Sequence, residues 1–311
     1  MQKLVALALG LFLLFGGGFY IYSNRQDFGP VLALDLASIA VLLGVALVYA
    51  IIQGMLYNSV LKFMSIRMSQ VESFGALMLT LFGNYFFPFA GFGARGVYLY
   101  RAYGLSARLY SLSVVAIVLV ELTMYASFGV LAVAYLLPLA KIEVQLLFVF
   151  FACAVIGGVW LIFFKLPLLH RVQRLDNLSR ILDEWYEFRD TANLRPRLAF
   201  YTCLQFFGYS ALFGVAFTVL SIDITVAEAM LHSALSDFGF VFKVAPAGLG
   251  TYEALVVFSA NLTGKTASEA IMVLVLVRFA MLFWPMVLTP FFSSTFTRNA
   301  QVGSLRELTN G

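Results

Sequence analysis

Apolar residues along this chain come in long unbroken runs, without the two-residue alternation of a membrane β-strand or the polar face of a surface helix. Six runs free of Asp, Glu, Lys and Arg cover residues 4–24, 36–61, 73–94, 144–164, 198–222 and 279–297. Three more apolar runs, over 109–140, 229–264 and 270–297, contain embedded charges. Because a spanning helix needs about 20 apolar residues, the pattern predicts an all-α polytopic membrane protein.

Composition supports this class. Of the 311 residues, 62% are hydrophobic and 12% are charged, and the mean hydropathy is +0.92. Soluble domains are about half apolar and a quarter charged. The net charge of +4 reports orientation in a membrane protein, so we expect no nucleic-acid partner. Cys153 and Cys203 lie in apolar runs and indicate neither a disulfide framework nor a zinc site; we expect no metal and no cofactor.

The basic residues decide which apolar runs cross the membrane. If 73–94 crossed once, the basic segments after it would lie outside, against the positive-inside rule. If 73–108 and 229–262 instead enter from opposite faces and return, 15 basic residues lie inside, 3 outside and 2 in the membrane. We therefore predict two re-entrant segments, both termini in the cytoplasm, and a cytoplasmic (inner) membrane location. The six predicted transmembrane helices cover about 4–23, 36–57, 110–137, 144–164, 198–221 and 270–296.

The chain is predicted to form a single membrane domain, 1–311, in two halves. The first half covers about 1–164 and the second about 198–297. Between them, residues 166–190 place apolar side chains every three or four positions, with charges of both signs elsewhere. This spacing predicts an amphipathic helix on the inner membrane surface that connects the halves.

The two re-entrant segments resemble each other. Each contains a proline, then two glycines separated by one residue, and a charge seven residues after the proline. The first has Pro88, Gly91, Gly93 and Arg95, and the second has Pro246, Gly248, Gly250 and Glu253. The helix after each segment carries one charge, Glu121 in the first half and Arg278 in the second, so the signs are exchanged. We predict an inverted repeat with backbone breaks at these prolines and glycines and a binding site near the midplane.

The stretch GFGARG (91–96) also matches a dinucleotide-binding fingerprint. That motif must follow a strand and open a helix in a soluble βαβ unit, whereas here it follows NYFFPFA in an apolar run. The match is therefore discarded, and the glycines are interpreted as positions of broken or closely approached backbone.

Charged side chains within the membrane each cost about 2.5–3.5 kcal/mol. The candidates sum to zero charge, so we expect mutual ion pairs that either fix helix packing or line a cavity. They are Arg95, Glu121, Asp237, Lys243, Glu253 and Arg278. In a cavity, the bases would meet a lipid phosphate, and the acids would balance them or contact a cationic headgroup. Asn84 is interpreted either as a hydrogen-bonding partner of a headgroup or as a helix-packing amide.

These motifs resemble one family, the lysylphosphatidylglycerol synthase transmembrane region, the flippase-like domain of the multiple-peptide-resistance-factor family. The resemblance rests on GNYFFPFAGFGARGVYLYRAYGLS (83–106), Glu121, PAGLGTYEA (246–254) and Arg278. Family members often have an acid just before the first arginine, where this chain has Ala94. The resemblance implies a stand-alone member with the lipid-moving half and without the aminoacyl-transferase domain.

The leading expectation is a lipid translocase or lipid-handling permease that binds an anionic or zwitterionic phospholipid, or a polyprenyl phosphate. The alternative is a non-transporting partner or scaffold of a lipid or glycan synthase, and a membrane transferase ranks third. No nucleophile–base pair stands out, so we do not expect an enzyme. Membrane lipids are the expected partners; a lipid- or glycan-modifying enzyme and a second copy of the chain remain open.

Overall fold

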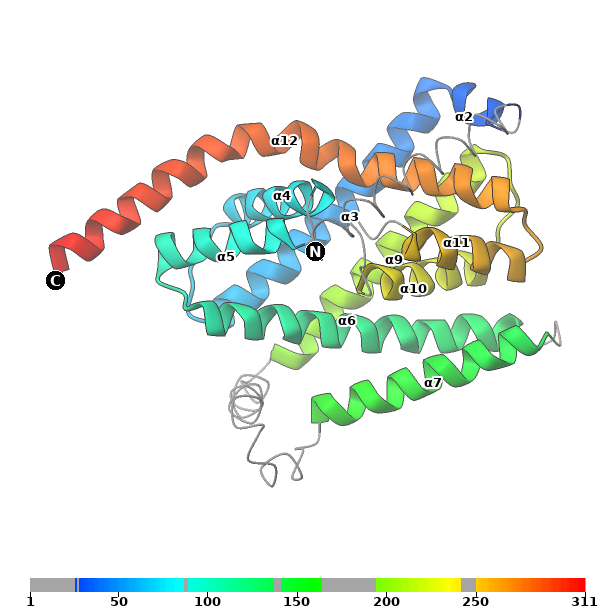
Figure 1. Cartoon of the computed structure of the whole chain (residues 1–311), viewed down its shortest axis with the longest axis horizontal. Helices are drawn as coiled ribbons and strands as arrows, with labels where there is room; N and C mark the ends of the chain where they lie inside the picture. The colour runs from blue at the N-terminus through cyan, green and yellow to red at the C-terminus, as the bar shows by residue number, and fades with distance from the viewer. Residues whose placement is uncertain are drawn as a thin grey trace, which may run out of the picture.

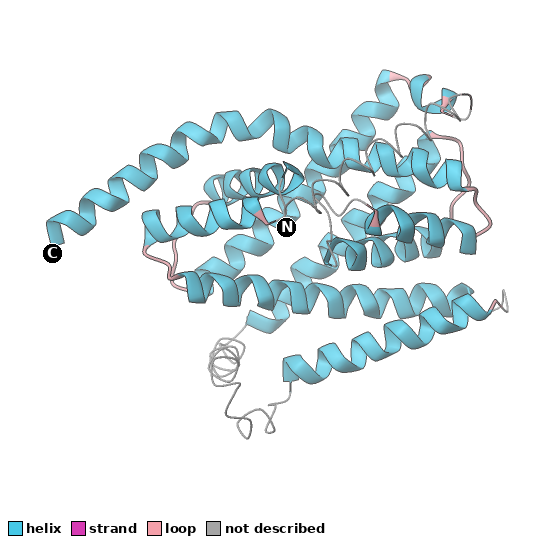
Figure 2. Cartoon of the chain, viewed as in Figure 1, coloured by secondary structure: helices cyan, strands magenta, loops and turns pink. Residues whose placement is uncertain are grey.

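The structure, a computed structural model, describes residue 26 and residues 28–86, 89–136, 141–163, 194–241 and 250–310. These residues form helices and short turns and contain no strand (Figure 2). The helices are α2 (Gly29–Leu32), α3 (Leu36–Phe63), α4 (Gln70–Phe86), α5 (Ala90–Tyr103), α6 (Ala107–Leu136), α7 (Ile142–Phe163), α9 (Leu194–Val219), α10 (Val226–Val241), α11 (Thr251–Leu262) and α12 (Ala267–Asn310). The all-α fold class is confirmed.

Five helices are long and apolar enough to cross a membrane. They are α3, α6, α7, most of α9 and the part of α12 up to Ser293. They coincide with five of the six predicted transmembrane helices; the predicted helix at 4–23 and the amphipathic helix at 166–190 lie outside the described residues. On α7, Leu146 is 63% and Ile156 is 69% exposed. Apolar side chains exposed on a helix that is apolar all round are suited to contact with lipid.

The last helix is longer than predicted. Its predicted end near residue 296 was placed where the apolar run stops, but α12 continues to Asn310. A helix that has formed can continue through polar residues. Hydropathy therefore locates the membrane-spanning part of a helix better than it locates the residue at which the helix ends. Pro285 and Pro290 lie inside this helix, as membrane helices tolerate.

The first predicted re-entrant segment is a pair of antiparallel helices, α4 and α5, which we call hairpin 1. The two helices approach closely where Gly83 faces Gly91, because a Cβ on Gly83 would lie 2.8 Å from the Gly91 Cα. At the open end, the Tyr103 hydroxyl donates a 2.6 Å hydrogen bond to Glu72 Oε1. The chain therefore leaves and returns at the same end of the bundle, the geometry that a re-entrant segment requires.

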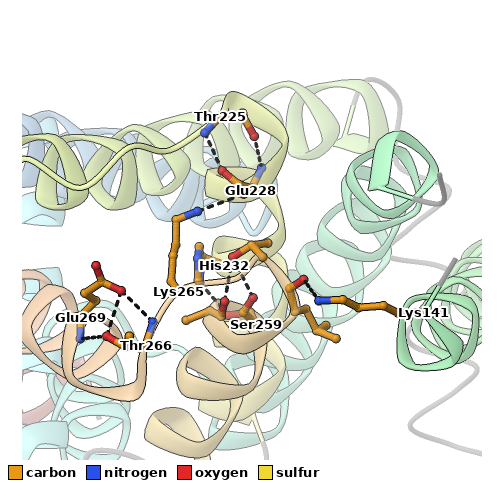
Figure 3. A network of polar contacts seen from close by, with 11 residues as sticks. Lys141, Thr225, Glu228, His232, Ser259, Lys265, Thr266 and Glu269 are labelled. Carbon is orange, nitrogen blue, oxygen red and sulfur yellow. Dashed lines mark hydrogen bonds and ion pairs between the residues drawn. The ribbon is translucent and has the colours of Figure 1, made fainter. Parts of the chain in front are cut away.

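The second segment forms the equivalent pair, α10 and α11, which we call hairpin 2. A polar network holds its open end together (Figure 3). Lys265 Nζ lies 3.0 Å from Glu228 Oε1, and the Thr225 N–H donates to Glu228 Oε2 at 2.7 Å. Deeper in the hairpin, His232 Nδ1 lies 2.6 Å from Ser259 Oγ, which ties α10 to α11. This network fixes the start of α10 against the start of α12.

The packing of the two halves repeats. Helix α3 packs against α4 as α9 packs against α10, and α6 packs against α10 as α12 packs against α4. The contacts of α6 with α9 likewise match those of α12 with α3. The two hairpins enter from opposite ends of the bundle, and the start of α5 and the start of α11 both lie near its middle (Figure 1). This arrangement is expected of an inverted repeat and brings residues of both hairpins, such as Asn84 and Tyr252, to one place.

Candidate functional site

Two hollows lie between the hairpin tips and the long helices. The larger, which we call the carboxylate cavity, has a cavity volume of about 80 Å³ and is lined by Glu121 and Asp237 among others. The smaller, which we call the arginine pocket, has a cavity volume of about 40 Å³ and is lined by Arg278 among others. The two hollows share four lining residues, Leu81, Asn84, Tyr209 and Met281, so they lie side by side and we describe them as one site.

The carboxylate cavity presents mainly hydrogen-bond acceptors. Glu121 Oε1, from the middle of α6, accepts a 2.9 Å hydrogen bond from Gln205 Nε2 on α9. The Gln53 Nε2 group on α3 donates to the Tyr49 hydroxyl at 2.9 Å. This leaves Gln53 Oε1 and Gln205 Oε1 buried without a hydrogen-bond partner. Because a buried acceptor without a donor is costly, the cavity is suited to a ligand that brings donors or positive charge.

The arginine pocket contains the ion pair of the second half. Arg278 Nη2 lies 2.5 Å from Glu253 Oε1, and the guanidinium carbon lies 4.8 Å from the centre of the Tyr252 ring. The contact is short, but its angle does not meet hydrogen-bond geometry, and Arg278 Nε and Nη2 have no hydrogen-bond acceptor. Glu253 Oε2 accepts the Gly250 N–H at 2.6 Å. Arg278 therefore keeps donor capacity toward an anion, while Glu253 holds the start of α11.

Asn84 stands where the two hollows meet. It is 5% exposed, and its Oδ1 accepts the Gly91 N–H at 3.0 Å across the tip of hairpin 1. The amide therefore satisfies a backbone donor at the start of α5. This contact favours the packing role for Oδ1, and the residue still faces both hollows.

Arg95 lines neither hollow. Its side chain is 3% exposed, its guanidinium carbon lies 3.7 Å from the centre of the Tyr57 ring, and its Nε donates to the Tyr110 hydroxyl at 3.2 Å. Tyr57 itself lines the carboxylate cavity and covers Arg95. Arg95 and Glu121, both described, do not form an ion pair, so the expectation of mutual pairing is wrong for this half. The reason is that the Tyr57 ring takes the guanidinium face and Gln205 takes the carboxylate.

The predicted backbone breaks divide into three groups. Gly250 has a φ of 89° directly before α11, a conformation that L-residues avoid. Gly91 and Gly93 lie inside α5 and not in the break, where Phe89 takes the left-handed φ of 62° instead. Pro88, Pro246 and Gly248 lie outside the described residues, as does Lys243, which was predicted to bind the substrate.

The two glycines of α5 have different roles. A Cβ on Gly91 would lie 1.8 Å from the Thr80 carbonyl oxygen, so this glycine permits the close packing of hairpin 1. A Cβ on Gly93 would meet no atom within 4 Å, and nothing in the structure requires glycine there.

A search for charges alone missed the neutral part of the site. Gln53 and Gln205 are amides inside long apolar runs. Four aromatic residues with a polar hydroxyl also line the hollows: Tyr49, Tyr57, Tyr209 and Tyr252. An amide in an apolar run is a usable signal, because it needs a partner in the membrane just as a charge does. Among the described residues there is no group of three or more His, Cys, Asp or Glu that could hold a metal.

The comparisons agree with this architecture. A family model described as the lysylphosphatidylglycerol synthase TM region matches residues 3–289. A comparison with curated proteins finds no match. The matched range contains both hairpins, both hollows and every residue of the site. The chain therefore belongs to the lysylphosphatidylglycerol synthase TM region family of membrane domains.

Proposed function

We propose that the protein translocates a phospholipid and binds its headgroup in the carboxylate cavity and the arginine pocket. The observation that carries this proposal is their adjacency. Acceptor oxygens of Glu121, Gln53 and Gln205 lie on one side of Asn84, and the Arg278 guanidinium lies on the other. A phosphate would contact Arg278, and an amine would contact the acceptors. This chemistry favours a zwitterionic headgroup over a polyprenyl phosphate, which brings no cation.

Two observations support movement of a lipid over chemistry on it. The family is the membrane region of a synthase, the part without the catalytic domain. His232 and Ser259 form a hydrogen-bonded pair, but both are fully buried and neither lines the two hollows. A substrate in the site could not reach the Ser259 hydroxyl, so the pair does not act as a nucleophile and base.

The charges of the described residues favour the orientation predicted from the sequence. One end of the bundle, where α3 and α5 end and α4 and α6 begin, carries four basic residues: Lys62, Arg67, Arg101 and Arg108. Arg197, at the start of α9, borders the same region. The opposite end carries Asp35, Glu143, Asp223, Glu228 and Glu269, with Lys141 and Lys265. By the positive-inside rule, the first end is cytoplasmic in this proposal. Hairpin 1 then enters from the cytoplasm and hairpin 2 from outside.

The orientation is tested by labelling single cysteines in a chain without Cys153 and Cys203. Ser106→Cys lies in the turn after hairpin 1, and Asn261→Cys lies near the end of hairpin 2; both native residues are exposed. In intact cells, an impermeant maleimide should label position 261 and should label position 106 only after permeabilisation. Equal labelling of both positions from outside would contradict the two opposed hairpins.

Translocation is tested in proteoliposomes that contain acyl-chain-labelled phosphatidylethanolamine, phosphatidylglycerol or phosphatidylcholine. Chemical quenching of the outer leaflet reports lipid movement, with and without a pH gradient. We expect wild-type protein to move at least one zwitterionic lipid faster than empty vesicles do. A matched control is Gly93→Ala, which adds a methyl group into open space and should behave as wild type. Rates equal to those of empty vesicles for all three lipids would reject translocation and favour the scaffold alternative.

A further inference from the structure

Arg95 is a buried cation that forms no ion pair with any described residue. The residue is 3% exposed, and its Nη1 and Nη2 groups have no hydrogen-bond partner. The Nε group reaches the Tyr110 hydroxyl, and the ring of Tyr57 lies against the guanidinium face. Neither tyrosine supplies a negative charge, and no described carboxylate lies within ion-pair distance of Arg95.

The guanidinium lies in a hollow of its own. This third hollow has a cavity volume of about 10 Å³, room for about one water molecule, so a larger group enters only if Tyr57 moves. Its polar lining consists of Arg95, Tyr57, Tyr110, Ser73 and Ser113. The two serines donate to the backbone carbonyls of Gly54 and Tyr110, so neither supplies a charge to Arg95. Tyr57 lines this hollow and also the carboxylate cavity. A change in the Tyr57 side chain would therefore join the Arg95 hollow to the site.

An uncompensated charge inside a membrane protein is destabilising, and such residues usually mark a ligand pathway. Arg278 shows the contrast, because it lies beside Glu253 at 2.5 Å. The Nη1 and Nη2 groups of Arg95 lie in one plane and lack hydrogen-bond acceptors, so together they can donate to two oxygens of one phosphate. Glu121 also carries negative charge, but it accepts from Gln205 and faces the cavity beyond Tyr57.

We propose that Arg95 is a second binding site for the phosphate group of the lipid, separated from the carboxylate cavity by the Tyr57 ring. This inference rests on the proposed function, since it gives the phosphate a site at hairpin 1 in addition to Arg278 at hairpin 2. Tyr57 is then a positioning residue: its ring covers the guanidinium when no phosphate is bound and moves aside when one enters.

The test measures the thermal unfolding of the purified full chain in detergent, alone and with dioctanoyl phosphatidylethanolamine. We expect the lipid to raise the Tm of the wild type. Arg95→Met should unfold at a temperature no lower than wild type without lipid, because it removes an unpaired buried charge, and should lose at least half of the lipid-induced shift. Arg95→Lys should keep more of that shift than Arg95→Met does. A fall of several degrees in Tm for lipid-free Arg95→Met, with the full lipid-induced shift retained, would make Arg95 a packing residue and overturn the proposal.

Control ligands separate the possible sources of a shift. Dioctanoylglycerol has the same acyl chains without the phosphate and should give a smaller shift. An equal shift with this ligand, or an Arg95-dependent shift with inorganic phosphate and none with the phospholipid, would overturn the assignment to a lipid phosphate. A wild-type chain that responds to no lipid rejects the proposed function and this site together. A normal wild-type shift that Arg95→Met leaves unchanged rejects this site alone.

The alternative partner for Arg95 within the chain is Glu121, and exchanging the two charges tests this alternative. In the double variant Arg95→Glu with Glu121→Arg, a pair between these positions would be restored, while a phosphate site at position 95 would be destroyed. We expect the double variant to lack the lipid-induced shift and lipid transport. Recovery of transport to the wild-type rate would show that Arg95 pairs with Glu121 in another state, and would overturn the phosphate site.

Discussion

Hairpin 1 and hairpin 2 occupy matching places in the bundle but hold their charges differently. At hairpin 2, Glu253 pairs with Arg278 on the following helix at 2.5 Å. At hairpin 1, Arg95 stacks on Tyr57, and Glu121 on the following helix bonds to Gln205. The packing differs in the same way, because α12 lies against both α11 and α5, whereas the contact of α6 with α5 is narrow.

Exchange of the acidic and basic positions between two repeats does not imply that both repeats form the same ion pair. Both halves have an acid and a base at similar spacing, so a count of charges predicts two ion pairs. Glu253 is in the first turn of α11, where it also accepts the Gly250 N–H, and from there it reaches α12. Arg95 lies a turn deeper in α5 and contacts α3 through Tyr57. Local position in the helix, more than charge, decides the partner.

The largest expected effect tests the close packing of hairpin 1. Gly91→Leu would drive side-chain atoms into the Thr80 carbonyl, because the Cβ alone would lie 1.8 Å from its oxygen. Overpacking of side chains costs about 1–3 kcal/mol, and a backbone clash costs more, so we expect little folded protein by size-exclusion chromatography in detergent. Gly93→Leu, two residues away in open space, should elute as wild type. A monodisperse Gly91→Leu protein with wild-type Tm would show that the hairpin opens readily.

The second test breaks the pair that distinguishes hairpin 2. Arg278→Met leaves Glu253 without its base, and we expect a loss of about 3 kcal/mol, the low end for a broken buried pair, because both side chains are partly exposed. This loss should lower the Tm by several degrees. The double variant Glu253→Gln with Arg278→Met should recover most of the Tm but not lipid transport. If Arg278→Met alone is as stable as wild type, the pair contributes nothing to hairpin 2.

The third test concerns the acid of the first half. Glu121→Gln keeps the shape and an acceptor for Gln205 but removes the charge, so the Tm should change little. Hydrogen bonds to charged groups contribute about 1.5–3 kcal/mol, and the loss of one toward a lipid amine should slow transport of phosphatidylethanolamine about tenfold or more. Transport of phosphatidylglycerol, which has no amine, should fall less. An equal fall for both lipids would contradict the role of Glu121 as the amine contact.

The smallest expected effect compares the starts of the two hairpins. Thr225 and Glu228 cap α10 reciprocally. At the start of α4, Ser69 accepts the Glu72 N–H at 3.1 Å, and Glu72 also accepts hydrogen bonds from Tyr98 and Tyr103, which hold this end together by other contacts. Loss of a cap costs about 1 kcal/mol. Thr225→Ala should therefore lower the Tm by a few degrees, and Ser69→Ala should lower it less. The reverse order would show that the Ser69 cap of hairpin 1 is the stronger one.

The sequence alone determined the helical fold and the place of the site along the chain. Five apolar runs became helices long enough to span a membrane, because hydropathy over about 20 residues is a local property. Both Pro–Gly segments lie where the structure has a helical hairpin, and Gly250 takes a positive φ directly before α11, a conformation that glycine adopts readily. Of the polar residues that the sequence singles out, Asn84, Glu121, Asp237 and Arg278 line the two hollows, and Glu253 lies against Arg278; their role in binding stays a prediction.

Only the tertiary structure decided which of these groups meet. The Glu253–Arg278 contact joins residues of two helices, and the Tyr57 ring that separates Arg95 from the cavity comes from a third. Gly91 and Gly93 look alike in the sequence, but only Gly91 faces the backbone of Thr80. Such choices depend on the angle and depth at which helices pack, to within about one ångström. The positions of side chains from different helices are fixed to this precision only when all the helices have packed together.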